Sequence, residues 1–105
     1  MIIQVVNFHL KDLSDAEYRN VCDGLAPELA LVPGLISKVW LADETSNTYG
    51  GVYTWVDRQA MDAFARSDFF QAFASNPNFA NITSSVFGIL EGPSQVTRAS
   101  IAIAA

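Results

Sequence analysis

The order in which strand-like and helix-like patterns follow one another constrains the fold of this chain most strongly. Short runs rich in Ile, Val, Phe and Trp, typical of strands, occupy 2–10, 35–42, 49–56 and 79–90. Stretches with apolar residues at helical spacing follow the first and the third run. The order βαββαβ predicts a ferredoxin-like α+β fold, in which both helical stretches lie on one face of a four-stranded antiparallel sheet.

The first helix is predicted from its N-terminal capping signal and its apolar face. Ser14 and Glu17 have the spacing of a capping box, in which each side chain accepts a backbone N–H that the helix leaves unpaired. Four residues then follow at helical spacing: Tyr18, Val21, Cys22 and Leu25. Pro27 is expected to end or kink the helix, because proline has no backbone N–H to donate.

The second helical stretch begins after Asp57, which can cap it. Its residues at helical spacing are Ala60, Met61, Phe64 and Ala65. The stretch 67–77 predicts a further, separate helical segment. We interpret its phenylalanines as core or dimer packing: Phe69, Phe70 and Phe73. Residues 91–105 form a C-terminal extension that is predicted either to add an edge strand or to fray.

The composition indicates one domain over 1–105 and argues against several classes of function. The net charge is −5 and the six basic residues are scattered, so nucleic-acid binding is not expected. No apolar run reaches the ~18 residues of a membrane span, and 1–11 lacks a secretory leader. We therefore expect a cytoplasmic protein that does not bind membranes.

Scarce cysteine and histidine limit the chemistry further. The chain has one cysteine, Cys22, and one histidine, His9. An internal disulfide is impossible, and the usual metal sites lack ligands, so no metal is expected. We interpret Cys22 as an inert buried thiol on the apolar face of the first helix. A reducing cytoplasm suits this cysteine usage.

The hairpin 35–56 sorts its residues into two chemically different faces. A symmetric turn at 43–48 would form four cross-strand pairs: Ala42 with Tyr49, Trp40 with Gly51, Lys38 with Tyr53, and Ile36 with Trp55. Paired residues share a face, so one face is aromatic and carries one lysine: Ile36, Lys38, Trp40, Gly51, Tyr53 and Trp55. The other face is aliphatic: Leu35, Val39, Leu41, Val52, Thr54 and Val56.

We expect the helices to pack on the aliphatic face, which leaves the aromatic face for another surface. Soluble monomers rarely expose so large an apolar patch, so we expect a homodimer whose two sheets face each other. The enclosed space would hold a small aromatic or apolar molecule. Gly51 is expected at the floor of this space, where its missing side chain leaves room opposite Trp40. Gly50 is expected on the helix-covered face, where it admits a close helix or a bulge.

Three segments of the chain resemble the monooxygenase family typified by YdhR, which is related to the antibiotic-biosynthesis monooxygenases. The segments are PGLISKVWLADE from Pro33, GGVY from Gly50 and VFGILEGPSQVTRA from Val86, within a resemblance that covers 2–99. The resemblance implies a dimeric α+β barrel and a cofactor-independent oxidation, without flavin, haem or metal, of a small aromatic or polyketide-like compound. Gln4 matches a position that the family often fills with glutamine, whereas Gly88 stands where relatives have a more polar residue.

These arguments select the candidate site residues. The predicted substrate-binding residues are Gln4, Lys38, Trp40, Gly51, Tyr53 and Trp55. Oxidation without a cofactor requires a base that converts the substrate into an electron-donating anion, and the candidate catalytic residues are Lys38, Tyr53 and His9.

Each candidate also has a purely structural interpretation. Lys38 can pair across the dimer with Glu44 or another acid, or extend outward at the rim of the barrel. The aromatic residues can fill the core, and His9 can be a satisfied or surface histidine. The alternative function is a non-oxidative one, in which a ligand-binding protein, an isomerase or a cyclase uses the same pocket. A structural dimer module is the third hypothesis.

Overall fold

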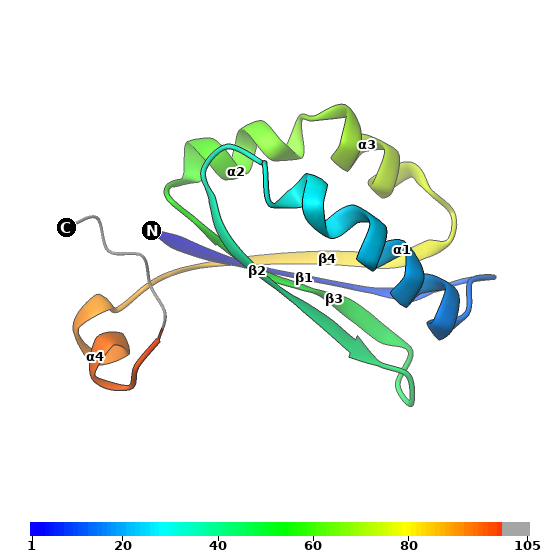
Figure 1. The fold of residues 1–105 in the computed structure, drawn as a ribbon, viewed down its shortest axis with the longest axis horizontal. Helices are drawn as coiled ribbons and strands as arrows, with labels where there is room; N and C mark the ends of the chain where they lie inside the picture. The colour runs from blue at the N-terminus through cyan, green and yellow to red at the C-terminus, as the bar shows by residue number, and fades with distance from the viewer. Residues whose placement is uncertain (100–105) are drawn as a thin grey trace.

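The computed structural model describes residues 1–99 and has the predicted ferredoxin-like architecture (Figure 1). The strands are β1 (Ile2–Leu10), β2 (Leu35–Asp43), β3 (Thr48–Trp55) and β4 (Phe79–Gly88). The helices are α1 (Asp15–Leu29), α2 (Arg58–Ala65), α3 (Asp68–Ser75) and α4 (Glu91–Val96). The antiparallel sheet has the order β2-β3-β1-β4, and α1, α2 and α3 all cover one of its faces. No helix within 1–99 is long and apolar enough to cross a membrane.

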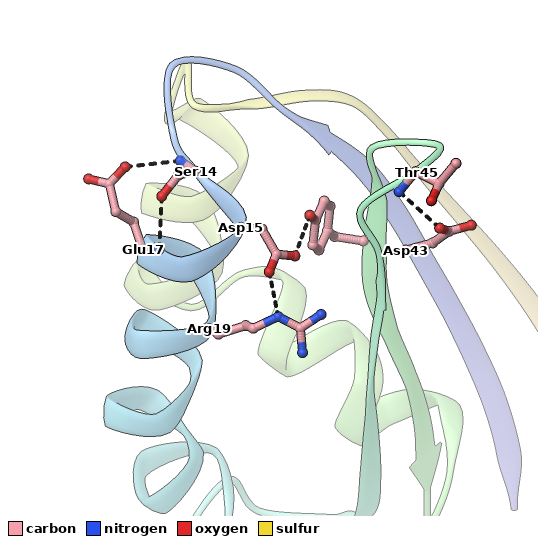
Figure 2. Close-up of polar contacts among 7 residues, drawn as sticks. Ser14, Asp15, Glu17, Arg19, Asp43 and Thr45 are labelled. Atoms are coloured by element: carbon pink, nitrogen blue, oxygen red, sulfur yellow. Dashed lines mark hydrogen bonds and ion pairs between the residues drawn. The ribbon is translucent and has the colours of Figure 1, made fainter.

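The capping box at the start of α1 is present as predicted. The backbone N–H of Ser14 donates to Glu17 Oε1 at 3.0 Å, and the backbone N–H of Glu17 donates to Ser14 Oγ at 3.1 Å (Figure 2). The prediction that Pro27 ends the helix was wrong, because α1 continues through it to Leu29, whereas a kink at Pro27 stays a prediction. Pro27 lies in the last turn, where a proline removes a single helical hydrogen bond close to the natural end of the ladder.

A partly buried polar contact ties α1 to the sheet. The Tyr49 hydroxyl donates to Asp15 Oδ1 at 2.6 Å, and Arg19 Nε donates to Asp15 Oδ2 at 2.6 Å (Figure 2). The hydrogen bonds from Arg19 and Tyr49 lower the pKa of the Asp15 carboxyl. The same carboxylate raises the pKa of Tyr49 to about 12, so the phenol stays a donor. This contact fixes the first turn of α1 over β3.

The remaining helices partly match the sequence predictions. The Asp57 side chain caps α2 by accepting the backbone N–H of Ala60, and a separate helix, α3, follows with Ser67 as its cap. Residues 91–96 of the C-terminal extension form helix α4, and Figure 1 shows this helix beyond the end of β4, apart from the other helices. The small and β-branched residues at 100–105, on which the edge-strand prediction also rested, lie outside the described residues.

The predicted hairpin register is correct at three of its four pairs. Lys38 pairs with Tyr53, Trp40 with Gly51, and Ala42 with Tyr49. The fourth pair was wrong: a register shift between Leu35 and Ser37 places Leu35, not Ile36, opposite Trp55. The turn is also shorter than predicted, since Asp43 and Thr48 are already paired. The Asp43 side chain accepts the backbone N–H of Thr45 at 3.2 Å and so shapes this turn (Figure 2).

The assignment of the two faces was wrong: the helices cover the aromatic face. Trp55 is 0% exposed and Tyr53 is 7% exposed, and both rings pack against Phe64 of α2, with centroids 5.5 Å and 6.2 Å away. The helices present aromatic rings of their own, and large rings packed against large rings remove more apolar area from water than aliphatic contacts do.

The aliphatic face is the uncovered one. We call it the outer face, and its apolar residues are Ile3, Val5, Val39, Leu41, Val52 and Phe87. Val39 and Phe87 are each 57% exposed. Polar residues share this face at its other positions, among them Asn7, Thr83 and Ser85. The sheet therefore has one aromatic face covered by helices and one mixed, more exposed face.

Candidate functional site

A cavity within the single chain lies on the helix-covered side of the sheet. It has a volume of about 360 Å³ and lies between the sheet and helices α1 and α3. Its walls are mainly apolar and aromatic, and they include Val21 and Leu25 of α1 and Phe69, Phe70 and Phe73 of α3. The space expected between the facing sheets of a dimer stays a prediction. The cavity is large enough for a one- or two-ring molecule.

Lys38 supplies the only charged side chain among the residues that line this cavity. Its Nζ lies 3.5 Å from the ring centroid of Trp40 and 4.7 Å from that of Tyr53, within cation–π range of both rings. Within 1–99 of the single chain Lys38 makes no hydrogen bond or ion pair, and pairing with Glu44 across a dimer stays a prediction. The lysine is therefore held by ring faces rather than by an acid.

Gly51 makes this position of Lys38 possible. A Cβ at Gly51 would lie 2.6 Å from Cε of Lys38, so the lysine stem crosses the strand where the side chain is missing. Gly51 clears space for the lysine and does not itself line the cavity, whereas Gly50 does. The predicted role of Gly51 as a floor is thus replaced by a positioning role.

The apolar surroundings change the protonation of the side chains around Lys38. Burial lowers the pKa of Lys38 to about 8, which leaves a substantial neutral fraction just above neutral pH. Burial raises the pKa of Tyr53 to about 12 and also raises the pKa of Tyr18, to which the neighbouring Cys22 adds. The cavity therefore combines one amine that can accept a proton with tyrosines that stay protonated.

Two predicted substrate-binding residues, Gln4 and Trp55, do not line the cavity. The Trp55 indole Nε1–H donates to Gln4 Oε1 at 3.0 Å, and Gln4 Nε2 donates to Ser84 Oγ at 3.0 Å. Trp55 stacks on Tyr53 with centroids 5.9 Å apart and planes 3° from parallel. These residues form a satisfied polar network in the core behind Tyr53, and they position the wall of the cavity rather than contact its contents.

His9 lies outside the cavity, which corrects its candidacy as a catalytic residue. It alternates with Phe8 along β1, and its Nδ1 lies 2.7 Å from the backbone oxygen of Asn47 in the turn before β3. Phe8 faces the cavity, so the neighbouring His9 side chain must face the other side of the sheet. No group of three or more His, Cys, Asp or Glu within 1–99 could hold a metal ion.

For several residues that line the cavity, the sequence pattern predicted packing alone. Tyr18 and Cys22 of α1 line the cavity, as do Phe69, Phe70 and Phe73 of α3. The helical spacing of these residues correctly indicated an inward face, but it does not distinguish a filled core from a hollow one. The sequence did carry one signal of an aromatic-lined site under the helices, since α1 and α3 both have aromatic side chains at positions that must face the sheet.

Comparison with known proteins identifies the family. Residues 2–100 match the family model described as "Putative mono-oxygenase ydhR". The chain belongs to the YdhR family. Its match spans nearly the whole chain and includes every residue that lines the cavity. No curated protein matches the chain.

Solved structures share the fold at low sequence identity. A Deinococcus radiodurans protein described as a "putative antibiotic biosynthesis monooxygenase" superposes with a TM-score of 0.69 at 14% identity, covering 85% of this chain and 92% of its own. SnoaB of Streptomyces nogalater, a cofactor-independent oxygenase, superposes with a TM-score of 0.67 at 21% identity, and the match covers 85% of this chain and 92% of the SnoaB chain. MhuD, solved with manganese protoporphyrin IX bound, superposes with a TM-score of 0.68 at 17% identity, and the match covers 86% of this chain and 95% of the MhuD chain.

Proposed function

We propose that this YdhR-family protein is a cofactor-independent monooxygenase that oxidises a small aromatic or polyketide-like compound bound between the sheet and the helices. The observation that carries the proposal is Lys38, an amine that within 1–99 has no acidic partner, in a cavity whose other walls are mainly apolar and aromatic. Such a cavity favours a flat aromatic molecule with one acidic group, because its anion would pair with the ammonium. The cofactor-independent oxygenase SnoaB shares the fold.

The proposed chemistry needs only a base and molecular oxygen. Neutral Lys38 takes a proton from an activated CH₂ or phenol group of the substrate, and the resulting ammonium stabilises the enolate or phenolate. The anion gives one electron to O₂, and the two radicals combine into a peroxide. Loss of water then leaves a carbonyl, so that R₂CH₂ and O₂ become R₂C=O and H₂O. Trp40 and Tyr53 hold the ring and exclude water.

A haem-dependent function has less support from the residues of this chain. A porphyrin iron is commonly held by a histidine, and the sole histidine, His9, lies outside the cavity beside Asn47. The cavity residues that could approach an iron are Cys22 and the tyrosines Tyr18 and Tyr53. Tyr18 and Tyr53 both have raised pKa values, which disfavours the anionic form that binds iron. The residues that line the cavity therefore do not fit a haem whose iron is held by a histidine.

Oxygen consumption tests the proposal directly. The purified protein is given a panel of anthrones, quinols and naphthols, first in a binding assay and then in an oxygen electrode. We expect at least one bound compound to be oxidised with one O₂ consumed per carbonyl formed. Binding without oxygen uptake across the whole panel would reject oxygenation and favour the non-oxidative binder, isomerase or cyclase.

We also propose that the protein is a homodimer that buries its outer face. Val39 on β2 and Phe87 on β4 are more than half exposed there, and Ile3, Val5, Leu41 and Val52 share the same face. The dimer would bring two sheets together while leaving each cavity under its own helices. Sedimentation at micromolar concentration checks the assembly, and a monomer there would contradict it. The cytoplasmic location expected from the single cysteine stays a prediction.

A further inference from the structure

The chain has an unusually small set of amines, which makes each one separable by experiment. The only amines are the N-terminus, Lys11 and Lys38, and the other basic residues are arginines and one histidine. Lys11 is exposed directly after β1, whereas Lys38 lies in the cavity wall. The two lysines thus provide a reactive candidate and a matched internal control in the same molecule.

Lys38 has the surroundings of a nucleophilic lysine. A lysine that serves only as a charge is normally hydrated or paired with an acid, but Nζ of Lys38 contacts two ring faces and has no acid or hydrogen-bond partner within 1–99. Burial lowers its pKa to about 8. Desolvation of this kind is how proteins make a lysine nucleophilic near neutral pH.

The cavity also leaves room for an electrophile beside this amine. About 360 Å³ of space lies against Lys38, bounded by apolar and aromatic side chains such as Phe70 and Val21. Gly51 leaves the lysine stem free to lie across the strand, so Nζ borders the cavity instead of projecting along the sheet. An aromatic ring placed between these walls would bring a carbonyl substituent to the amine.

We propose that Lys38 forms an imine with the carbonyl carbon of a small aromatic aldehyde or ketone, an oxygen-independent activity of the cavity. The nitrogen lone pair attacks the carbonyl carbon and forms a C–N bond, and a proton moves from nitrogen to oxygen. The carbinolamine then loses water to give the imine, so amine and carbonyl become imine and H₂O. Hydrolysis reverses the step and exchanges the carbonyl oxygen with water. This activity does not depend on the proposed oxygenation.

Reductive trapping under anaerobic conditions tests the imine. The full-length protein is mixed with 2-naphthaldehyde and sodium cyanoborohydride at pH 7, and the modified residue is found by peptide mass spectrometry. We expect modification at Lys38 at least about 10-fold faster than at Lys11, because a lowered pKa enriches the neutral amine about tenfold per unit. Its rate should rise with pH through about 8. Equal modification of the two lysines, or none at Lys38, would overturn the proposal.

Substitutions test whether the fast modification depends on the position of Lys38 in the cavity or only on the general reactivity of a lysine. Lys38→Arg should lose the fast-forming adduct, while Lys11→Arg should keep it. Gly51→Ala places a Cβ 2.6 Å from Cε of Lys38, a contact that the flexible side chain relieves by moving, so it should fold and slow modification of Lys38. An unchanged rate in folded Gly51→Ala would contradict the positioning. An adduct at Lys38 in protein that consumes no oxygen would support the imine and reject the oxygenase.

Discussion

Gly50→Ala is expected to unfold the protein or to leave it only marginally folded. A Cβ at Gly50 would lie 1.8 Å from the carbonyl oxygen of Val6 and 2.8 Å from its carbonyl carbon, and the residue has φ +154°. Both obstructing atoms belong to the backbone of β1, which pairs with β3 on one side and β4 on the other. Neither β1 nor β3 can move away from the other without disrupting the pairing at the centre of the sheet. We expect a loss above ~4 kcal/mol, out of a total of ~5–15 kcal/mol for a domain.

Gly24→Ala is the matched control for this variant. Gly24 lies in α1, and a Cβ there would meet nothing within 4 Å. Alanine is the better helix former, so this variant should gain about 0.5–1 kcal/mol. Urea denaturation of both variants, followed by circular dichroism, measures the difference. A Gly50→Ala protein within about 1 kcal/mol of the wild type would contradict the close β1–β3 approach described above.

Lys38→Met is expected to reduce oxygen uptake on any substrate of this protein about 100-fold or more in kcat/KM, which corresponds to at least about 2.7 kcal/mol. Methionine keeps much of the length and the apolar contacts with Trp40 but cannot take the proton. In the wild type, kcat/KM should rise as the pH rises through about 8, because the lowered pKa of Lys38 makes the neutral, proton-accepting form dominant above that value. The Lys38→Met variant should lose this rise.

Two further substitutions make the result specific to the base. Lys11→Met removes an exposed lysine outside the cavity and should leave kcat/KM unchanged. Lys38→Arg keeps the positive charge but cannot act as a base at neutral pH, so it should preserve binding, seen in KM, and lose kcat. If Lys38→Met retains the wild-type rate and pH profile, the proposed role of the lysine is excluded.

The topology and most of the hairpin register were predictable because they depend on local signals. The capping box at Ser14, the cap at Asp57 and the two-residue alternation of the hairpin are each written in a few neighbouring residues. The shift between Leu35 and Ser37 was not predictable, since the hydrophobic alternation reads equally well with either residue opposite Trp55. Pro27 was misjudged because its cost depends on how near the helix end lies.

The choice of the covered face could not be made from the hairpin alone. Both faces of β2 and β3 are apolar, so the hairpin sorts the residues correctly without saying which set meets the helices. The other two strands held the missing information: Asn7 on β1 and Ser85 on β4 share the face of Val39, which marks that face as the more polar one. The cavity found within the single chain lies beneath the helices, and Lys38, Trp40 and Tyr53 line it.

A crystal structure of the protein soaked with 1-naphthol under anaerobic conditions tests the central claim most directly. The claim is that the site lies between the sheet and α1 and α3, with Lys38 as its polar anchor. We predict ring density between Trp40 and Phe70, with the naphthol oxygen within about 3.2 Å of Lys38 Nζ. Ring density on the outer face at Val39, with the cavity beneath the helices free of ligand, would contradict it.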